Sequence, residues 1–380
     1  MILRQHEQLP LPESIDEIEL IMVNIPFKKP FSTSNYTWLG KEALLVKISS
    51  GELTGWGECV ADPDPFYSPE TVTSCRFIIK EFILPELKNV KTFGELYRYL
   101  NKVRGNRMAK AAVENALLDL AAKQKGLPLY TYLGYKPVKI KSGISIGIKD
   151  KTYDVLYEVD EAVEKNYHRV KVKITKGKDL SVIRDIRKHY LILPLMADAN
   201  GAYLQSEWEH LQKLDRFNLM MIEQPLSYDD IYEHATLQTR ITTDLCLDES
   251  IHSIADARTA IALNACRVIN IKQGRVGGML EALAIAEYAQ HQRVPVWSGG
   301  MDETGIGRAF NLHLQTHPGF TLPGDTSETS RYFNEDIINE PVVLDVEGYI
   351  SLPDGNGVGV SINDSGMNKF TISKELVMKS

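Results

Sequence analysis

The stretch VKVKI at residues 170–174 decides the expected fold, because its apolar residues alternate with two lysines as in a strand with two different faces. Charged residues end five successive apolar runs at steps of 25, 25, 25 and 24 residues: Lys173, Asp198, Glu223, Asp248 and Lys272. A step of this size fits one strand and one helix, the unit of a parallel α/β barrel. Barrel enzymes place their chemistry at the carboxyl ends of the strands, so the repeat predicts a fold and the location of an active site.

The residues before this repeat have a different pattern. Three strand-like segments come first and helix-like segments follow: Ile18–Pro26, Ala43–Ser49, Thr54–Cys59, then Pro69–Phe82, Phe93–Val103 and Arg107–Gln124. The last segment is rich in Ala and Leu and is closed by Gly126 and Pro128, which are helix-ending residues. This order predicts a separate α+β domain over residues 1–135.

From about Val138 onward, strand-like and helix-like segments alternate. Ile140–Ile146 is the first expected strand, Val294–Trp297 the seventh, and Phe320–Pro323 a candidate eighth. We therefore predict a barrel over residues 136–339. The tail is rich in turn glycines and strand-like residues, and we expect a segment of about 340–380 to pack back on the first domain.

Composition narrows the class of protein. The 380 residues are 43% hydrophobic and 24% charged, as in a globular protein, and a net charge of −7 argues against nucleic acid or an anionic membrane as the main partner. No apolar stretch approaches the roughly 20 residues of a membrane span, and the N-terminus lacks the apolar core of a secretory signal. The four cysteines form no CxxC pair, so we expect buried, reduced thiols rather than a zinc site. These features predict a cytoplasmic protein.

Asp198, Glu223 and Asp248 would bring three carboxylates to neighbouring strand ends. Hard oxygen ligands suit octahedral Mg²⁺, with Mn²⁺ as a substitute, better than zinc, which favours His or Cys. A single acid at such a place is as often a helix cap or an ion-pair partner as a metal ligand. Because all three recur at one period, we favour a Mg²⁺ site.

Lys171 and Lys173 are two residues apart, so both would face the barrel interior, about 6.6 Å apart along the strand. This placement is costly unless carboxylates and a bound anion lie opposite, although solvated lysines on an exposed strand are the alternative. A neighbouring ammonium and a divalent cation would lower the pKa of a lysine here toward the range that a base needs. Lys272 would stand across an eight-strand ring, on the other face of a substrate. Such a pair suits proton removal next to a carboxylate, with racemisation when both bases act.

Two glycine-containing stretches remain open to interpretation. IKQGRVGG (271–278) has some features of a phosphate-binding loop but lacks the strand–GxxxxGK[ST]–helix order, so we predict a helix start with tight turns. The turn Ser298-Gly299-Gly300-Met301 either admits a substrate close to the backbone or only turns the chain.

Together these residues resemble the enolase superfamily, and within it the muconate-lactonizing subgroup. The motifs that carry the resemblance are KVK (171–173), DAN (198–200), IEQP (222–225), DES (248–250) and IKQGRVGG (271–278). SGGMDETGIGR (298–308) and PGDTSETSRYF (323–333) further resemble the o-succinylbenzoate synthase/N-succinylamino acid racemase family. The resemblance covers nearly the whole chain and implies a (β/α)7β TIM-like barrel with an α+β capping domain.

The resemblance also implies roles for matching residues. Asp198, Glu223 and Asp248 would bind Mg²⁺, supported by Asn200. Lys173 would be the main acid/base beside Lys171, and Lys272 the base on the opposite face or, in the synthase reaction, a cation against the substrate ring. Arg275 stands where racemase-competent members carry an arginine. The substrate pocket would be lined by Ser145, Asn200, Arg275, Ser298, Gly299, Gly300 and Met301. A mobile cap loop at residues 31–38 would close over it with Phe31, Ser32, Tyr36 and Trp38.

The chain departs from these families at a few positions. Gln273 stands where proline is common, and Asp302 where an apolar residue is common, so this acid either changes the side chain that is accepted or faces solvent. The mandelate-racemase branch expects a histidine where Trp297 and Ser298 stand. Dipeptide epimerases expect Asp-x-Asp after the eighth strand, and residues 325–327 (DTS) supply only the first acid.

The favoured hypothesis is a Mg²⁺-dependent enzyme acting on a small carboxylate with a succinyl or acyl group, as o-succinylbenzoate synthase, N-succinylamino acid racemase, or both. Another reaction of the subgroup, such as cycloisomerisation or dipeptide epimerisation, is the first alternative. A barrel that binds a metal and a ligand without turnover is the second. We also expect a homo-oligomer.

Overall fold

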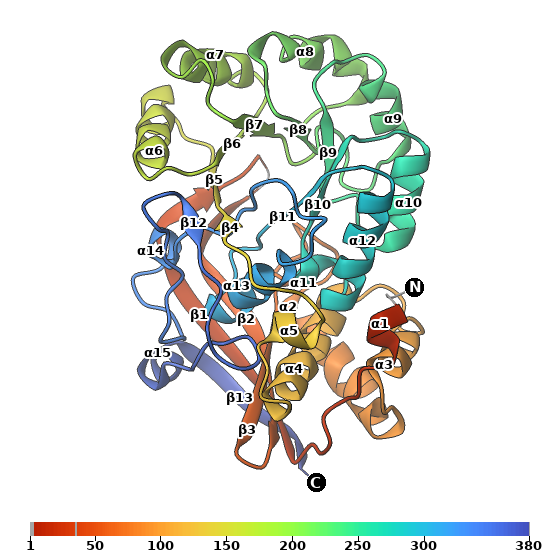
Figure 1. Ribbon diagram of the computed structural model, residues 1–380. Helices are drawn as coiled ribbons and strands as arrows, with labels where there is room; N and C mark the ends of the chain where they lie inside the picture. Colours follow the sequence, from red (N-terminus) through yellow and green to blue (C-terminus); the bar gives the residue numbers. More distant parts are fainter. Residues whose placement is uncertain (1–3, 35, 380) are drawn as a thin grey trace.

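The computed structural model describes residues 4–34 and 36–379, which form a lower cap and an upper parallel barrel (Figure 1). The cap contains an antiparallel sheet in the order β13-β1-β2-β3. Its strands are β1 (Glu17–Ser32), β2 (Thr37–Ser50), β3 (Leu53–Cys59) and, from the other end of the chain, β13 (Thr371–Lys379). The three strands expected near the N-terminus are confirmed, and the tail returns to pair with β1.

Helices complete the cap. They are α1 (Arg4–Glu7), α2 (Val72–Ile78) with the turns η1 (Ile79–Ile83) and η2 (Leu84–Asn89), α3 (Phe93–Leu100), α4 (Arg107–Gln124) and α5 (Leu129–Tyr132). The sequence predicted the bounds of α4 correctly. This helix is buried from Met108 to Ala122, which explains its many alanines: it lies between the cap sheet and the barrel.

Seven parallel strands form the barrel, in the order β11-β10-β9-β8-β7-β6-β5. They are β5 (Gly143–Ile146), β6 (Arg169–Lys173), β7 (Leu195–Asp198), β8 (Ile222–Glu223), β9 (Leu245–Leu247), β10 (Val268–Ile271) and β11 (Val296–Ser298). The helices between and after them are α6 (Thr152–Glu164), α7 (Asp179–His189), α8 (Trp208–Gln212), α9 (Tyr232–Gln238), α10 (Ile254–Ala262), α11 (Gln273–Val276), α12 (Met279–His291) and α13 (Gly305–Leu314). Short turns η3 (Gln205–Glu207) and η4 (Asp215–Phe217) flank α8.

The predicted eighth strand at Phe320–Pro323 is wrong as a regular strand. Two isolated parallel bridges, Val296 with Phe320 and Ser142 with Gly324, take its place and close the ring between β11 and β5. Pro323 has no backbone N–H to donate to a ladder, which limits regular pairing here. The remaining elements are β4 (Ile140–Lys141), α14 (Thr329–Tyr332), β12 (Tyr349–Ile350), which pairs with β4, and α15 (Asp364–Phe370).

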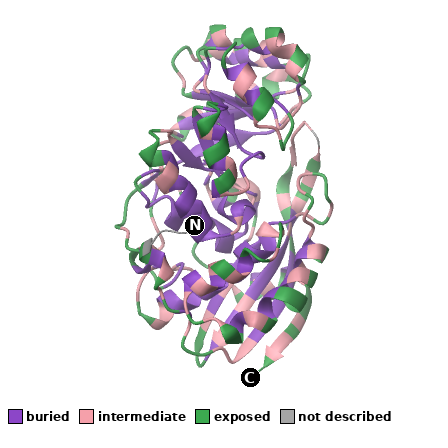
Figure 2. Cartoon of the chain, turned by 90° about the vertical axis from the view of Figure 1, so that its right-hand side faces the viewer, coloured by how far each residue is buried: buried purple, intermediate pink, exposed green. Residues whose placement is uncertain are grey.

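The barrel strands are buried on both faces along almost their whole length (Figure 2). Val170 and Val172 of β6, and Ile174 directly after it, belong to an apolar cluster with the helices outside the barrel, as expected. The two lysines between them therefore face the interior. All four cysteines are buried and free, as predicted. None of the described helices is long and apolar enough to cross a membrane.

Candidate active site

A cavity of about 480 Å³ lies where the barrel mouth meets the cap. Lys171 and Lys173 from the end of β6 line it, and so does Lys272, which follows β10. From the cap, Phe31, Tyr36 and other aromatic residues line it as well. The repeat that begins at VKVKI therefore ends its strands around one cavity.

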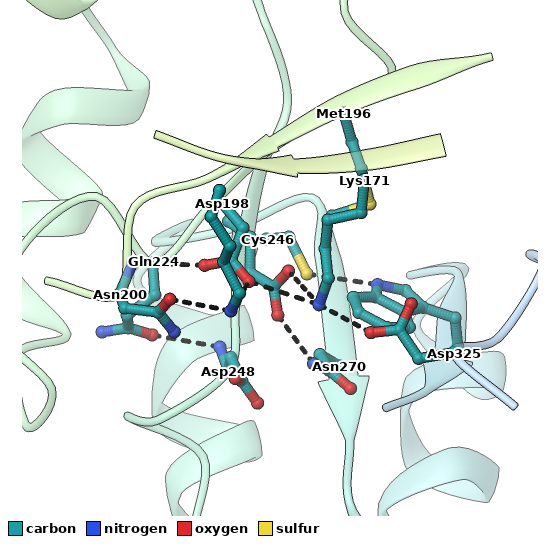
Figure 3. Close-up of polar contacts among 12 residues, drawn as sticks. Lys171, Met196, Asp198, Asn200, Gln224, Cys246, Asp248, Asn270 and Asp325 are labelled. Atoms are coloured by element: carbon teal, nitrogen blue, oxygen red, sulfur yellow. Dashed lines mark hydrogen bonds and ion pairs between the residues drawn. The ribbon is translucent and has the colours of Figure 1, made fainter. Parts of the chain in front are cut away.

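Lys171 is almost fully buried and is surrounded by acids (Figure 3). Its Nζ lies 2.6 Å from Asp325 Oδ2, 3.1 Å from Glu223 Oε2 and 3.2 Å from Asp198 Oδ2. Burial lowers the pKa of Lys171, but the three carboxylates outweigh it and raise this pKa well above its ordinary value. This shift is opposite to the lowering expected from the sequence, because acids rather than cations are the nearest groups. Lys171 is therefore fixed as a charged group.

Lys173 is held beside Lys171 by two oxygen acceptors. Its Nζ donates to Asp198 Oδ2 at 2.6 Å and to Asn200 Oδ1 at 2.7 Å. Asn200 reaches this place through a left-handed backbone conformation with φ of +45°, and its Nδ2 donates to Glu249 Oε1 at 2.8 Å. Asn200 thus orients the ammonium group of Lys173 toward the cavity that both residues line.

Lys272 has its own set of partners on the opposite side. Its Nζ lies 2.9 Å from Asp248 Oδ2 and donates to Tyr67 Oη at 3.0 Å. Arg275 pairs with Asp248 Oδ1 and donates to Tyr67 at 3.3 Å. Burial lowers the pKa of Lys272, but Asp248 and Tyr67 raise it well above its ordinary value. For Asp248, burial raises the pKa, but Arg275 and Lys272 lower it below its usual range.

The expected metal ligands come together, but not in a metal-binding arrangement. Within residues 4–34 and 36–379, no three His, Cys, Asp or Glu side chains are arranged to hold a metal ion. Lysines and Arg275 instead occupy the carboxylates, which explains why the expected ligand set is not preformed. The donor chemistry still suits a hard cation: Asp198 and Glu223 are register partners on neighbouring strands, and both are fully buried. Burial and the repulsion from Asp198 raise the pKa of Glu223 well above its ordinary value, so a further cation would stabilise this group.

The other predicted pocket residues divide into two groups. Ser145, Asn200, Gly300 and Met301 line the cavity. Ser298, Gly299 and Arg275 are not among the residues that line it. A Cβ on Gly299 would come within 2.3 Å of Asn270 Oδ1, so glycine is needed here for packing against Asn270.

The expected cap loop lies over the barrel mouth. Phe31, Tyr36 and Trp38 line the cavity, whereas Ser32 bonds away from it, to Thr37 Oγ1 at 2.8 Å. Ser34 Oγ donates to Ala199 O at 3.1 Å, next to Asp198, so the loop contacts the barrel directly. Asn35, within the expected loop, lies outside the described residues.

Four residues of the site were not assigned a role here from the sequence. Tyr67 comes from the cap, and no sequence motif around it indicated a role in the site. Glu249 follows Asp248 in the DES motif, and burial followed by repulsion from Asp248 raises its pKa to about 7. Asn270 donates to Glu223 Oε1 at 2.7 Å, and its place in β10, two residues before Lys272, could have predicted that it faces the same side. Asp325, considered earlier only as part of an epimerase motif, pairs with Arg169 as well as Lys171.

Comparison with known proteins agrees with this geometry. Residues 17–134 match the mandelate racemase / muconate lactonizing enzyme N-terminal domain, and residues 154–366 match the enolase C-terminal domain-like family. The chain belongs to the enolase superfamily. The family and the capped-barrel fold expected from the motifs are thereby confirmed.

Individual relatives cover almost the whole chain. An o-succinylbenzoate synthase from Geobacillus kaustophilus is 44% identical over 94% of this chain and 96% of its own. An N-succinylamino acid racemase from Thermus thermophilus is 40% identical over 94% of this chain and 97% of its own. Among solved structures, an enolase superfamily member from Enterococcus faecalis V583 has a TM-score of 0.90 at 42% identity, and the match covers 97% of this chain and 100% of that one.

Proposed function

We propose that this superfamily member removes a proton α to the carboxylate of a small acyl- or succinyl-bearing substrate, as o-succinylbenzoate synthase, N-succinylamino acid racemase, or both. The observation that carries the proposal is the pair Lys173 and Lys272, which line one cavity from β6 and from the end of β10. These strands are separated by three others in the sheet order, so the two ammonium groups approach a substrate from different sides. The full-length relatives named for these two reactions support the same conclusion.

The lysines would share the proton transfer. One lysine in its neutral form would take the α-proton, and the other, as an ammonium, would return a proton to the opposite face, which inverts the carbon. In dehydration, Lys173 would take the proton while Lys272 stays charged beside the developing negative charge. Lys171, held by three carboxylates, would remain a fixed cation near the substrate carboxylate.

Asp198, Glu223 and Asp248 would hold Mg²⁺, or Mn²⁺ as a substitute, when the enzyme is loaded. The ion would supply electrostatic stabilisation of the charge that develops on the substrate carboxylate. Around the three lysines, five acids lie near five cations: Asp198, Glu223, Asp248, Glu249 and Asp325 near Arg169, Lys171, Lys173, Lys272 and Arg275. A divalent cation and a doubly negative substrate would enter together without a net change in buried charge, because their own charges cancel.

The two-base proposal is tested by isotope exchange. In D₂O with Mg²⁺, the wild type should exchange the α-proton of both enantiomers of N-succinylphenylalanine. Replacing either Lys173 or Lys272 by Ala should stop racemisation while one enantiomer still exchanges. Undiminished racemisation in both variants contradicts the proposal. Parallel assays on 2-succinyl-6-hydroxycyclohexadiene carboxylate measure the dehydration reaction, and chelation by EDTA should abolish both reactions until Mg²⁺ is restored.

The alternatives gain less from the structure. Dipeptide epimerisation would need Asp325 to hold a substrate ammonium group, but Arg169 and Lys171 already pair with this carboxylate. A barrel without turnover would not need two lysines on separate sides of one cavity. The cytoplasmic location, the homo-oligomeric state and the domain bounds given above stay predictions.

A further inference from the structure

Asp302 presents an unpaired carboxylate to the cavity that holds Lys173 and Lys272. It follows the Ser298–Met301 turn after β11, and its backbone is left-handed, with φ of +53°. No hydrogen bond or ion pair of this carboxylate occurs within the described part of the chain. A left-handed residue other than glycine is uncommon, and such strain persists where the surrounding structure imposes it, often at binding sites. The chain thus holds an acid in an uncommon backbone conformation without a hydrogen-bond or ion-pair partner among the described residues.

Asn311 offers a second unpaired acceptor in the same wall. It is only 2% exposed, lines the cavity, and its Nδ2 donates to Glu303 Oε1 at 2.9 Å. A carboxylate only accepts, so this bond fixes which end of the amide is nitrogen. Its Oδ1 has no donor among the described residues. A buried acceptor without a donor is destabilising, and a ligand with N–H groups would satisfy it.

The charge of this wall is mainly acidic. Asp62, Asp302 and Glu303 line it against Lys41 and Arg308. Lys41 donates to Val60 O at 3.0 Å and lies 3.9 Å from Asp62, so it neutralises Asp302 only from a distance. Burial raises the pKa of Asp302 and that of Asp62, although Lys41 lowers both.

The two cations also have limited freedom. Arg308 donates to Glu303 O at 3.0 Å and to Ser327 O at 3.3 Å, and its guanidinium lies 4.5 Å from the centre of the Tyr332 ring. Arg308 is therefore a fixed part of the wall. A positively charged group of a ligand would pair with the carboxylate of Asp302 and donate a hydrogen bond to Asn311 Oδ1.

We infer that Asp302 and Asn311 bind the positively charged end of the substrate's side chain, so that N-acyl derivatives of basic amino acids are the preferred substrates. The inference rests on the proposed racemase function. The α-carbon of such a substrate carries a hydrogen, a carboxylate, an acylated nitrogen and a side chain. The carboxylate belongs near Lys171 and Lys173, and a succinyl group ends in an anion that Asp302 repels. Only the side chain can bring an ammonium or guanidinium group to this wall, where charge-assisted hydrogen bonds would form.

This assignment ranks the two proposed reactions. The cyclohexadiene substrate of the dehydration has two carboxylates and no cation, so it gains nothing from Asp302. Basic N-succinylamino acids would gain roughly ten- to hundredfold in kcat/KM from a charge-assisted hydrogen bond in the buried wall.

The test compares three substrates of similar length on the Mg²⁺-loaded enzyme: N-succinyl-lysine, N-succinyl-norleucine and N-succinyl-glutamate. The wild type should racemise the lysine derivative at least about tenfold more efficiently than the norleucine derivative, and the glutamate derivative least. Asp302→Asn, which keeps the shape and tolerates the left-handed backbone, should remove the lysine preference, so that kcat/KM for the lysine derivative falls to about that for the norleucine derivative. Asp185→Asn, a surface acid paired with Lys188, is the matched control and should change neither rate.

Two outcomes separate this inference from the proposed function. Racemisation of all three derivatives without a lysine preference, or a preference that survives in Asp302→Asn, overturns the cation subsite but leaves the racemase proposal standing. If no derivative is racemised, the racemase proposal fails, and calorimetric binding decides the subsite. Tighter binding of N-succinyl-lysine than of N-succinyl-norleucine, lost in Asp302→Asn, would support the subsite, and equal binding would overturn it.

Discussion

At the scale of single residues, the site consists of buried charges that fix one another. Lys272 contacts Asp248 and Tyr67, while Lys173 contacts Asp198 and Asn200. The two proposed bases therefore have different neighbours. Of the two, Lys272 lies over an aromatic ring, 5.1 Å from the centre of Tyr67. A change at Tyr67 should therefore affect one face of the substrate more than the other.

Tyr67→Phe tests this asymmetry. The variant keeps the ring but removes the hydroxyl that accepts from Lys272 and Arg275, so Lys272 loses an orienting partner. We expect α-proton exchange to fall roughly tenfold or more for the enantiomer that Lys272 deprotonates, identified as the one that Lys272→Ala no longer exchanges. The other enantiomer should exchange at nearly the wild-type rate. Tyr190→Phe, which removes a bond to surface Asp160, is the control. An equal fall for both enantiomers would mean that Tyr67 acts only on the fold.

The sequence predicted those residues of the site whose position follows from strand geometry. The spacing of Lys171 and Lys173 determines which face they share, and Asp198 is the register partner of Lys173 across β6 and β7. Tyr67 and Asp325 reach the same cavity from the cap and from the irregular eighth position of the barrel. Their place depends on how distant segments pack, which local periodicity does not encode. For the same reason, the sequence left open whether Asp302 faces solvent or substrate.

At the scale of elements, α4 connects the two halves of the molecule. One side packs against β3, where Gly55 and Gly57 allow the two backbones to approach closely. The other side contacts the barrel, where Asn115 Nδ2 donates to Gln273 Oε1 at 2.8 Å. This bond explains the departure at Gln273: the side chain joins the cap to the start of α11 and does not line the substrate cavity.

Gly57→Ala tests the close approach of β3 and α4. A Cβ at this position would lie 2.0 Å from Ala112 O and 2.8 Å from Ala116 N, both in the backbone of α4. Because the helix is packed on its other side, we expect a loss of about 3 kcal/mol or more in the free energy of unfolding, measured by urea denaturation. Gly51→Ala is the matched control: it has a positive φ of +56° but open space, so it should cost only about 1 kcal/mol. Because Gly57 has no positive φ, a loss no larger than that of Gly51→Ala would contradict a steric limit at this contact.

At the scale of the whole molecule, buried polar bonds attach the cap to the barrel helices. Glu58 accepts from Thr304 and Gly307 at the start of α13, and Tyr97 donates to Glu281 of α12 at 2.6 Å. One apolar cluster also runs through both parts without interruption. The cap and the barrel therefore share a core, which keeps the aromatic residues of the cap over the lysines of the barrel.

Glu114 makes this interface sensitive to pH. Its carboxylate lies in α4, is 1% exposed and accepts from Leu280 N at the start of α12 at 2.9 Å. Burial raises its pKa from 4.5 to about 8. Between these two values the folded protein binds more protons than the unfolded chain, so the free energy of unfolding falls as the pH rises through this window. Glu114→Gln stays neutral and can still accept from Leu280, so it should lack this dependence.

Urea denaturation of the wild type and Glu114→Gln from pH 5 to 9 measures the effect. Across this range, the free energy of unfolding of the variant should rise by roughly 2–4 kcal/mol relative to that of the wild type, because each pKa unit corresponds to about 1.4 kcal/mol. Glu13→Gln removes an exposed carboxylate paired with Lys125 and should follow the wild type at every pH. If the free energies of unfolding of Glu114→Gln and the wild type change in parallel with pH, Glu114 is ionised in the folded protein throughout this range. The charge at the start of α12 would then stabilise the interface rather than oppose it.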